Sequence, residues 1–194
     1  MPPFHGVDER PAEADPTKVA VPSLEQIFEQ HAPFLWRALI GLGVPARDAQ
    51  DLCQEIMITV HRRLSQFDGA SLRAWLYGIC VRVASDYRRS ARVRREIVTD
   101  AEPEEGSATD PADTLDRERQ VRRLLSGLSR LDEPKRVAFV LFEIEELTLA
   151  EVSEAVGAPI QTVYSRIKAA REQMQRAFRT THDAPTKGGI SEAR

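Results

Sequence analysis

The sequence predicts an all-α protein: two small helical domains joined by an acidic flexible linker. Apolar residues make up 42% of the 194 residues and aromatic residues only 6%, a balance that favours helices over a β-sandwich. In both halves the apolar positions recur every three or four residues, which is the period of an amphipathic helix. Between the halves, residues 98–113 hold two prolines, one glycine and many carboxylates without an apolar rhythm, as expected of a linker.

The first helix is expected to begin at Ser23. Residues 1–22 are rich in Pro, Glu and Asp without periodicity, and predict a disordered arm. Ser23 and Gln26 form the S-x-x-Q pattern of a capping box, and apolar residues follow at helical spacing. Pro33 is expected to kink or split this helix, because proline removes an amide donor and crowds the preceding turn.

Two further helices complete the first domain, residues 23–95. The second is expected from Pro45 to about Leu64, with one apolar and one polar face. Ser71 is a cap for the third, which runs into an arginine cluster. Residues 82–95 carry six arginines against one aspartate, although the whole chain has a net charge of −3. Charge is therefore strongly segregated along the chain.

The second domain is expected over residues 115–180, after the acidic linker at 96–114 and before a disordered tail at 181–194. A helix from about Leu115 to Ser126 is followed by one that starts at Asp132 and Pro134. A T-x-x-E capping box then predicts a short helix that begins at Thr148.

The stretch "GAPIQTVYSRIKAAR" (157–171) predicts a helix-turn-helix. Gly157 suits a left-handed helix cap, and Pro159 suits the start of the next helix. One side of that helix is apolar and is expected to pack on the core: Ile160, Val163, Ile167, Ala170 and Met174. The opposite side carries Gln161, Thr162, Ser165, Lys168 and Ala169, flanked by Arg166. Short polar groups next to long cations suit a helix in the DNA major groove, although a merely solvated face has a similar composition.

Several classes of protein are disfavoured by what the sequence lacks. Cys53 and Cys80 lie in apolar patterns without metal-ligand spacing, which predicts two buried thiols in a reducing cytoplasm and no metal. No apolar run is long enough to span a membrane, and residues 1–22 are not a signal peptide, so a cytoplasmic protein without membrane insertion of its own is expected. The four histidines are scattered, and no phosphate loop or nucleophile–base set is present. Neither an enzyme nor a cofactor is predicted.

Two motif blocks resemble the sigma-70 family of bacterial sigma factors, and within it the extracytoplasmic-function (ECF) group. "DAQDLCQEIMITVHRRLSQFDG" (48–69) and "RAWLYGICVRVASDYRRSARVRR" (73–95) resemble successive parts of region 2. The segment 127–174, which contains "TVYSRI", resembles region 4. The resemblance covers about 130 of the 194 residues, and two blocks in the correct order are more specific than either alone.

The resemblance implies partners and site residues. The partners are core RNA polymerase, through its β′ clamp helices and β flap, promoter DNA and an anti-sigma factor. The polymerase-binding face would be Asp48, Asp51, Gln54 and Glu55, with Arg62 further along. The loop that captures unpaired bases of the minus-ten element would be Phe67, Asp68, Gly69, Ala70 and Ser71. Four arginines would help to bind the same DNA strand: Arg82, Arg88, Arg89 and Arg92. Minus-thirty-five duplex would be read by Gln161, Thr162, Ser165, Arg166 and Lys168.

Two positions depart from the pattern that many relatives show. Arg82 stands where an asparagine is common, which prevents transfer of a minus-ten base preference. Gln161 stands where a glycine is common, and its amide can itself read an adenine edge.

Three rival interpretations stay open at this point. A free-standing helix-turn-helix regulator would bind operators without polymerase, but would not require the first domain. A degenerate sigma-like regulator would bind proteins and no promoter, against which the cationic face at 161–168 argues. An enzyme would need a catalytic set that the sequence does not display.

Overall fold

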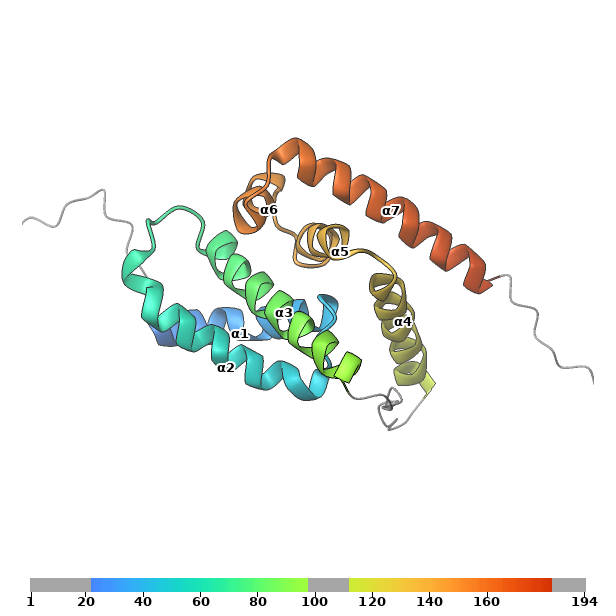
Figure 1. Cartoon of the computed structure of the whole chain (residues 1–194), viewed down its shortest axis with the longest axis horizontal. Helices are drawn as coiled ribbons and strands as arrows, with labels where there is room; N and C mark the ends of the chain where they lie inside the picture. Colours follow the sequence, from blue (N-terminus) through green and yellow to red (C-terminus); the bar gives the residue numbers. More distant parts are fainter. Residues whose placement is uncertain (1–21, 98–111, 183–194) are drawn as a thin grey trace, which may run out of the picture.

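The computed structural model describes residues 22–97 and 112–182, and all regular structure in these ranges is helical (Figure 1). The expectations for the arm, most of the linker and most of the tail lie outside the described residues. The longer helices, in chain order, are α1 (Leu24–Gly41), α2 (Ala46–Arg63), α3 (Leu72–Ile97), α4 (Ala112–Ser129), α5 (Glu133–Phe139), α6 (Leu149–Val156) and α7 (Ile160–His182). A 3-10 turn, η1 (Leu64–Gln66), follows α2, and a π-helical turn, η2 (Val140–Ile144), extends α5.

The helix starts follow the sequence signals closely. The Ser23 hydroxyl accepts from the amide of Gln26, whose side chain accepts in return from the amide of Ser23, as a capping box requires. Ser71 caps α3 through a 3.2 Å bond from the amide of Ala74. Pro33 does not split the first helix, since α1 is continuous from Leu24 to Gly41. Of the two expected outcomes, a kink or a split, the split is therefore excluded.

The second half also begins its helices where capping residues stand. Asp132 caps α5 by accepting from the amide of Lys135, and Thr148 with Glu151 forms the predicted capping box of α6. The helix predicted at Leu115–Ser126 is longer than expected, because α4 extends from Ala112 to Ser129. The helical content and the helix-turn-helix connection are therefore as the sequence predicts.

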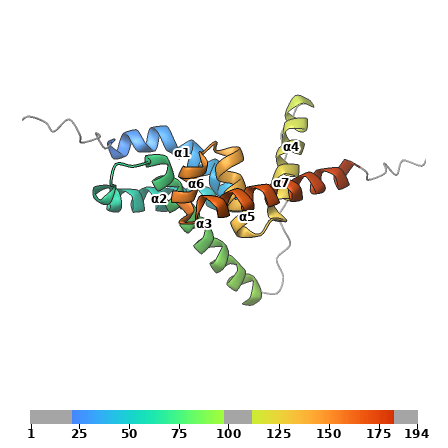
Figure 2. The ribbon, with the colours of Figure 1, turned by 90° about the horizontal axis from the view of Figure 1, so that it is seen from above.

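The two halves pack directly against each other, which the sequence did not predict. In Figure 1, α5 and α6 lie between α7 and α3, with α1 and α2 on the far side of α3. Figure 2 looks down on α7, which crosses over α5 and α6. Buried residues of both halves form one continuous cluster, from Ile27 in α1 to Met174 in α7. Two glycines let the backbones of the two halves come close together. A Cβ on Gly78 would lie 3.0 Å from the carbonyl oxygen of Ala155, and one on Gly41 would lie 3.2 Å from Val140.

Candidate nucleic-acid interface

The turn before α7 fixes how this helix projects from the domain. Gly157 has a φ of 63°, the left-handed conformation that favours glycine, and its amide donates to carbonyls at the end of α6. The hydroxyl of Ser153 donates to the carbonyl of Ala158 at 2.6 Å, which ties the turn to α6. The carbonyl of Pro159 then accepts from the amides of Thr162 and Val163 at 2.8 and 3.0 Å, closing the first turn of α7. The two helices are thus held rigidly, as a helix-turn-helix needs.

The buried side of α7 is narrower than the sequence predicted. Val163, Ile167, Ala170 and Met174 are buried as expected. Ile160 was expected in the core but is 50% exposed, because the chain enters α7 at Pro159 with this first residue beyond the edge of the packed stripe. That prediction is wrong, and the solvent face of α7 gains an apolar residue at its first position.

The residues that were predicted to contact duplex DNA do not all lie at the centre of the exposed face of α7. Gln161, Ser165 and Lys168 are exposed, whereas Thr162 and Arg166 are half-buried. Tyr164, which was not among the predicted site residues, is 52% exposed between Gln161 and Lys168. Tyr164 is one helical turn from each of these two residues, so the sequence spacing alone would have placed it on the same face of the helix.

The loop from Phe67 to Ser71 is partly ordered by its own contacts. The rings of Phe67 and Trp75 lie 5.4 Å apart at 45°. The Asp68 carboxylate accepts from the amide of Ala70 at 3.0 Å, and Gly69 has a φ of 83° with open space around it. These contacts give the loop a defined shape with an exposed tip.

Helix α6 of the second half reaches this loop. The hydroxyl of Ser71 donates to the carboxylate of Glu151 in α6 at 3.0 Å. Burial alone would raise the pKa of Glu151, but hydrogen bonds from the Thr148 amide and the Ser71 and Thr148 hydroxyls hold it below its usual range. Ser71 is therefore engaged by α6 rather than presented to a ligand.

The predicted arginines on α3 have different surroundings. Arg88 lies 3.9 Å from the carboxylate of Glu133 in α5, and Arg89 lies 4.0 Å from Asp86 on its own helix. The side chains of Arg82 and Arg92 are exposed. Arg88 thus contacts the second half through Glu133.

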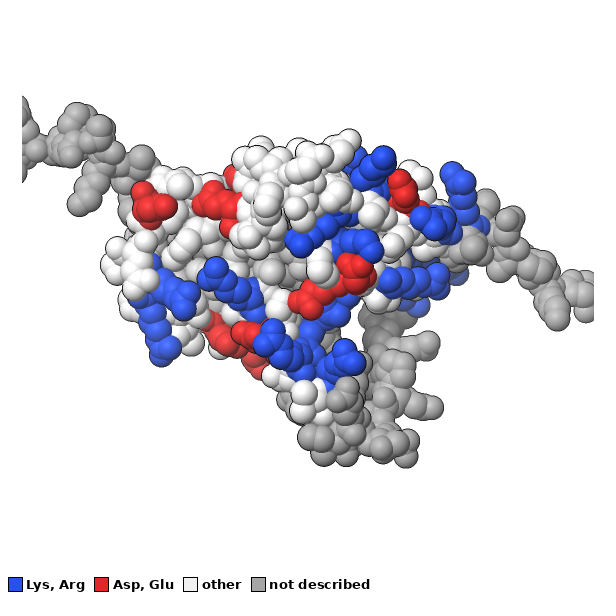
Figure 3. Space-filling model, turned by 45° about the horizontal axis from the view of Figure 1, so that its top comes forward, with Lys and Arg blue, Asp and Glu red and all other residues white. Residues whose placement is uncertain are grey.

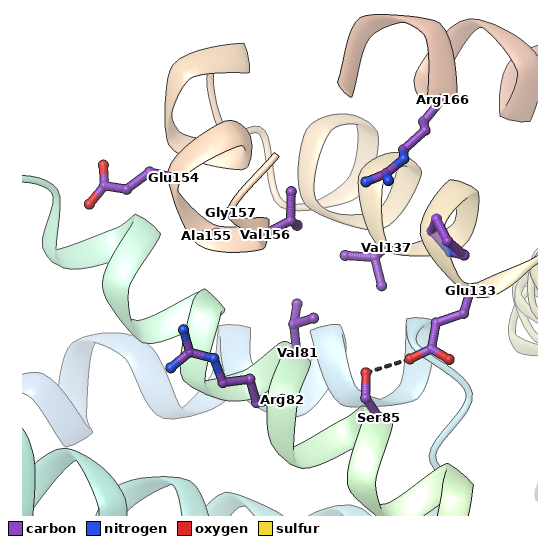
Figure 4. A pocket seen from close by; sticks show the side chains of 11 residues that line it. Val81, Arg82, Ser85, Glu133, Val137, Glu154, Ala155, Val156, Gly157 and Arg166 are labelled. Atoms are coloured by element: carbon purple, nitrogen blue, oxygen red, sulfur yellow. Dashed lines mark hydrogen bonds between the residues drawn. The ribbon is translucent and has the colours of Figure 1, made fainter. Parts of the chain in front are cut away.

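A cleft of about 340 Å³ lies between the two halves and brings two predicted DNA-binding residues together (Figure 4). Arg82 reaches it from α3 and Arg166 from α7. Ser85 on α3 donates a hydrogen bond to the carboxylate of Glu133 at its edge. The residues assigned to two separate DNA elements thus line one cavity in this arrangement.

The polar face of α2 is present, with one correction. Asp51, Gln54 and Glu55 are exposed at helical spacing along one side. Asp48 is half-buried and accepts a 2.5 Å hydrogen bond from the hydroxyl of Tyr87, so it also joins α2 to α3. Ile58, 52% exposed one turn beyond Glu55, belongs to the same strip and was not predicted.

A buried carboxylate lies at the junction between the halves. Glu145, 3% exposed, follows η2, and its side chain accepts a 2.7 Å hydrogen bond from Tyr77 in α3. Arg37 of α1 lies 3.6 Å from the same oxygen, and Arg73 donates to the Glu145 backbone carbonyl at 2.6 Å. Burial is the main cause that raises the pKa of the Tyr77 hydroxyl, and the hydrogen bond to Glu145 raises this pKa further.

The turn around Glu145 aims it into the first half. Its amide donates to the carbonyl of Val140 and that of Leu147 donates to Leu141, both at 3.0 Å. Glu146, between them, takes a φ of 55°, which is uncommon for a residue with a Cβ. The second carboxylate oxygen of Glu145, Oε1, has no hydrogen-bond partner in the described part of the chain.

Comparisons with known proteins identify the class. The family profile for Sigma-70 region 2 matches residues 27–94, and that for Sigma-70 region 4 matches residues 121–174. The ECF RNA polymerase sigma-E factor of Escherichia coli is 32% identical over 146 residues, covering 70% of this chain and 76% of the relative. The chain therefore belongs to the sigma-70 family, in its ECF group.

Other relatives agree with this assignment. The ECF RNA polymerase sigma factor SigE of Mycolicibacterium smegmatis is 30% identical over 171 residues; the match spans 87% of this chain and 66% of the relative. About a third of the length of this Mycolicibacterium smegmatis relative therefore lies outside the match.

Solved structures show the same fold. CnrH in complex with the cytosolic domain of CnrY matches with a TM-score of 0.62 at 24% identity, covering 81% of this chain and 88% of that one. The sigma factor RpoE, in complex with the anti-sigma factor NepR from Bartonella quintana, matches with a TM-score of 0.63 at 24% identity, covering 80% and 96%. In the described residues of the present chain, no helix has the length and apolarity to cross a membrane.

Proposed function

We propose that this protein binds core RNA polymerase, directs it to specific promoters and helps to open the DNA. The observation that carries the proposal is the pair of surfaces on two family-matched units: an exposed polar strip on α2 and a helix-turn-helix ending in α7. A free-standing regulator would have use for α7 alone. The protein would act without catalysis, in the cytoplasm where the polymerase is.

The exposed strip on α2 is proposed to contact polymerase. Asp51, Gln54 and Glu55 form a polar, acidic edge on a rigid helix, and Ile58 adds an apolar contact one turn further along. Acidic side chains steer association with basic partner surfaces, such as those expected of the β′ clamp helices. Asp48 is assigned a smaller part, because its carboxylate is already bound to Tyr87.

Residues 23–95 and 115–180 are proposed to read the two promoter elements. The exposed tip of the 67–71 loop would take unpaired minus-ten bases, and the arginines from Arg82 to Arg92 would contact phosphates. Gln161, Ser165 and Lys168 would approach the minus-thirty-five duplex directly, with Arg166 on the flank. The second unit would also dock on the β flap.

A protein inhibitor is proposed as a further partner. CnrH and RpoE, which share this fold, were solved with CnrY and with an anti-sigma factor, respectively. An anti-sigma factor for this chain would act by keeping the two halves from reaching polymerase and DNA together.

Run-off transcription with purified core polymerase tests the proposal. The templates are the DNA upstream of the protein's own gene and a library of randomised promoters. A discrete transcript that requires the protein is expected. Neither transcript nor co-elution with core enzyme would refute the sigma function, and specific duplex binding without polymerase would favour a free-standing regulator.

Variants separate the two proposed reading surfaces. Arg166→Ala and Lys168→Ala are expected to weaken binding to the minus-thirty-five duplex. Phe67→Ala and Asp68→Ala are expected to lower permanganate reactivity of the melted strand while polymerase stays bound. Unchanged footprints in the loop variants would contradict this division. Gln175→Ala, exposed further along α7, is the control.

A further inference from the structure

Two exposed apolar side chains stand one turn apart at the start of α7. Ile160 is 50% exposed and Tyr164 is 52% exposed, although α7 buries its other early apolar residues, Val163 and Ile167, almost completely. The Tyr164 hydroxyl makes no hydrogen bond to any described part of the chain. Packing within the protein therefore does not account for either side chain.

The pair lies in the turns of α7 that a recognition helix places against base edges. In helix-turn-helix proteins the N-terminal residues of the second helix contact the bases in the major groove. Tyr164 is three residues after Gln161 and four before Lys168, so these three side chains share one side of the helix. The apolar pair is thus continuous with the polar groups assigned to base reading.

The charge around the pair is arranged as DNA requires. From Ala155 to Ser165 the chain has no charged residue, while Arg166, Lys168 and Arg171 follow. Figure 3 shows an uncharged surface over the α6–α7 turn and cationic side chains further along α7. An uncharged tip beside cations matches a groove whose floor is bases and whose walls are phosphates.

We propose that Ile160 and Tyr164 are specificity-determining residues that read thymine methyl groups in the minus-thirty-five duplex. The C5-methyl group is the apolar feature that distinguishes thymine in the major groove, and apolar side chains recognise it by contact. Burying one methyl group is expected to change affinity about fourfold. The inference rests on the proposed function of α7 and specifies which base that helix prefers.

The test compares thymine with deoxyuridine, which lacks only the methyl group. The minus-thirty-five element is first defined by selection from the randomised library with holoenzyme. Each thymine in it is then replaced by deoxyuridine, and binding of holoenzyme to the duplex is measured. The wild-type protein is expected to lose about fourfold in affinity at one or two positions.

Variants connect that loss to the two side chains. Tyr164→Ala and Ile160→Ala are expected to bind the thymine duplex about fourfold more weakly and to ignore the deoxyuridine replacement. Tyr164→Phe keeps the ring and is expected to keep the discrimination. Gln175→Ala, exposed on the same helix beyond these turns, is expected to behave as wild type. Both targeted side chains are exposed, so the variants should fold, which circular dichroism checks.

Each outcome has a distinct meaning. Wild-type holoenzyme that selects a promoter but binds deoxyuridine duplexes equally well would overturn the methyl reading and leave the sigma function intact. Full discrimination in Tyr164→Ala and Ile160→Ala would also overturn it. If those variants lost only inhibitor binding, the pair would be a protein contact instead. Failure to select any promoter would overturn the proposed function and this inference with it.

Discussion

Replacing Gly78 with alanine is expected to separate the two halves of the protein. The new Cβ would lie 3.0 Å from the carbonyl oxygen of Ala155 and 3.5 Å from its Cα. Both neighbours are backbone atoms, so the backbone of α6 would have to shift away from α3 by a few tenths of an ångström. Overpacking of this kind costs about 1–3 kcal/mol.

Helix propensity does not offset this cost. Alanine stabilises a helix interior relative to glycine by about 1 kcal/mol, but α3 is a helix whether or not α6 lies against it. The protein is called closed when its two halves are packed together and open when they are apart. Because α3 is helical in both arrangements, the gain in helix propensity cancels in the equilibrium between them. The closed-to-open ratio should fall by about 5- to 150-fold, at 1.4 kcal/mol per factor of ten.

Small-angle X-ray scattering of the purified full chain measures the separation directly, and amide hydrogen exchange in α6 measures the lost contact. Gly78→Ala is expected to increase the radius of gyration and the exchange rate in α6. Ser90→Ala, at an exposed position of the same helix, is the matched control. If polymerase binds both units only when the halves are apart, the apparent affinity of the protein for core polymerase rises with the open fraction. The affinity can rise by at most the factor by which that fraction increases. Scattering and exchange identical to the Ser90→Ala control would refute the argument.

Three further predictions concern the cap, the pH dependence and the polymerase face. Gly157→Ala should lower the free energy of unfolding by about 1–2 kcal/mol in urea titrations, because the left-handed φ of 63° disfavours a Cβ although no atom lies within 4 Å of it. The pKa of Glu151 is lowered in the fold, so its stabilisation is present above its unfolded pKa of about 4.3 and lost as pH falls through the folded value. Urea titrations of Glu151→Gln and wild type should therefore differ at pH 7 and converge in acid; a constant difference would contradict this. Glu55→Gln should weaken core binding about threefold by fluorescence anisotropy, whereas Glu29→Gln on α1 should not, and equal effects would argue against the α2 strip.

Local signals in the sequence were sufficient for most of the fold. Ser23, Thr148 and Gly157 act on backbone groups within a few residues, so their effects can be predicted without knowing the rest of the chain. The helix-turn-helix and the exposed strip of α2 follow from such signals together with helical periodicity. Pro33 does not split α1, because a helix tolerates the loss of one amide donor when its packed face holds it in place.

Contacts between distant residues could not be read in the same way. The bond from Tyr77 to Glu145 joins residues 68 apart in sequence, and nothing beside Glu145 marks it as buried. Gly78 has no special φ, so its reason for being glycine is visible only when α6 lies against it. The exposure of Ile160 likewise depends on where Pro159 turns the chain, which periodicity alone does not reveal.

The chemistry of the junction suits an interface that opens. A carboxylate buried with one oxygen unpartnered is costly, since an unsatisfied buried polar group destabilises by about 1–3 kcal/mol. If the two halves separate, water hydrates Glu145 and Arg37. Separation therefore recovers the hydration free energy that the carboxylate lost on burial. An apolar pair of the same volume would hold the halves together more tightly. Under the proposed function each unit reads one promoter element, and a weaker junction then lowers the free energy that polymerase binding must supply to separate the two halves.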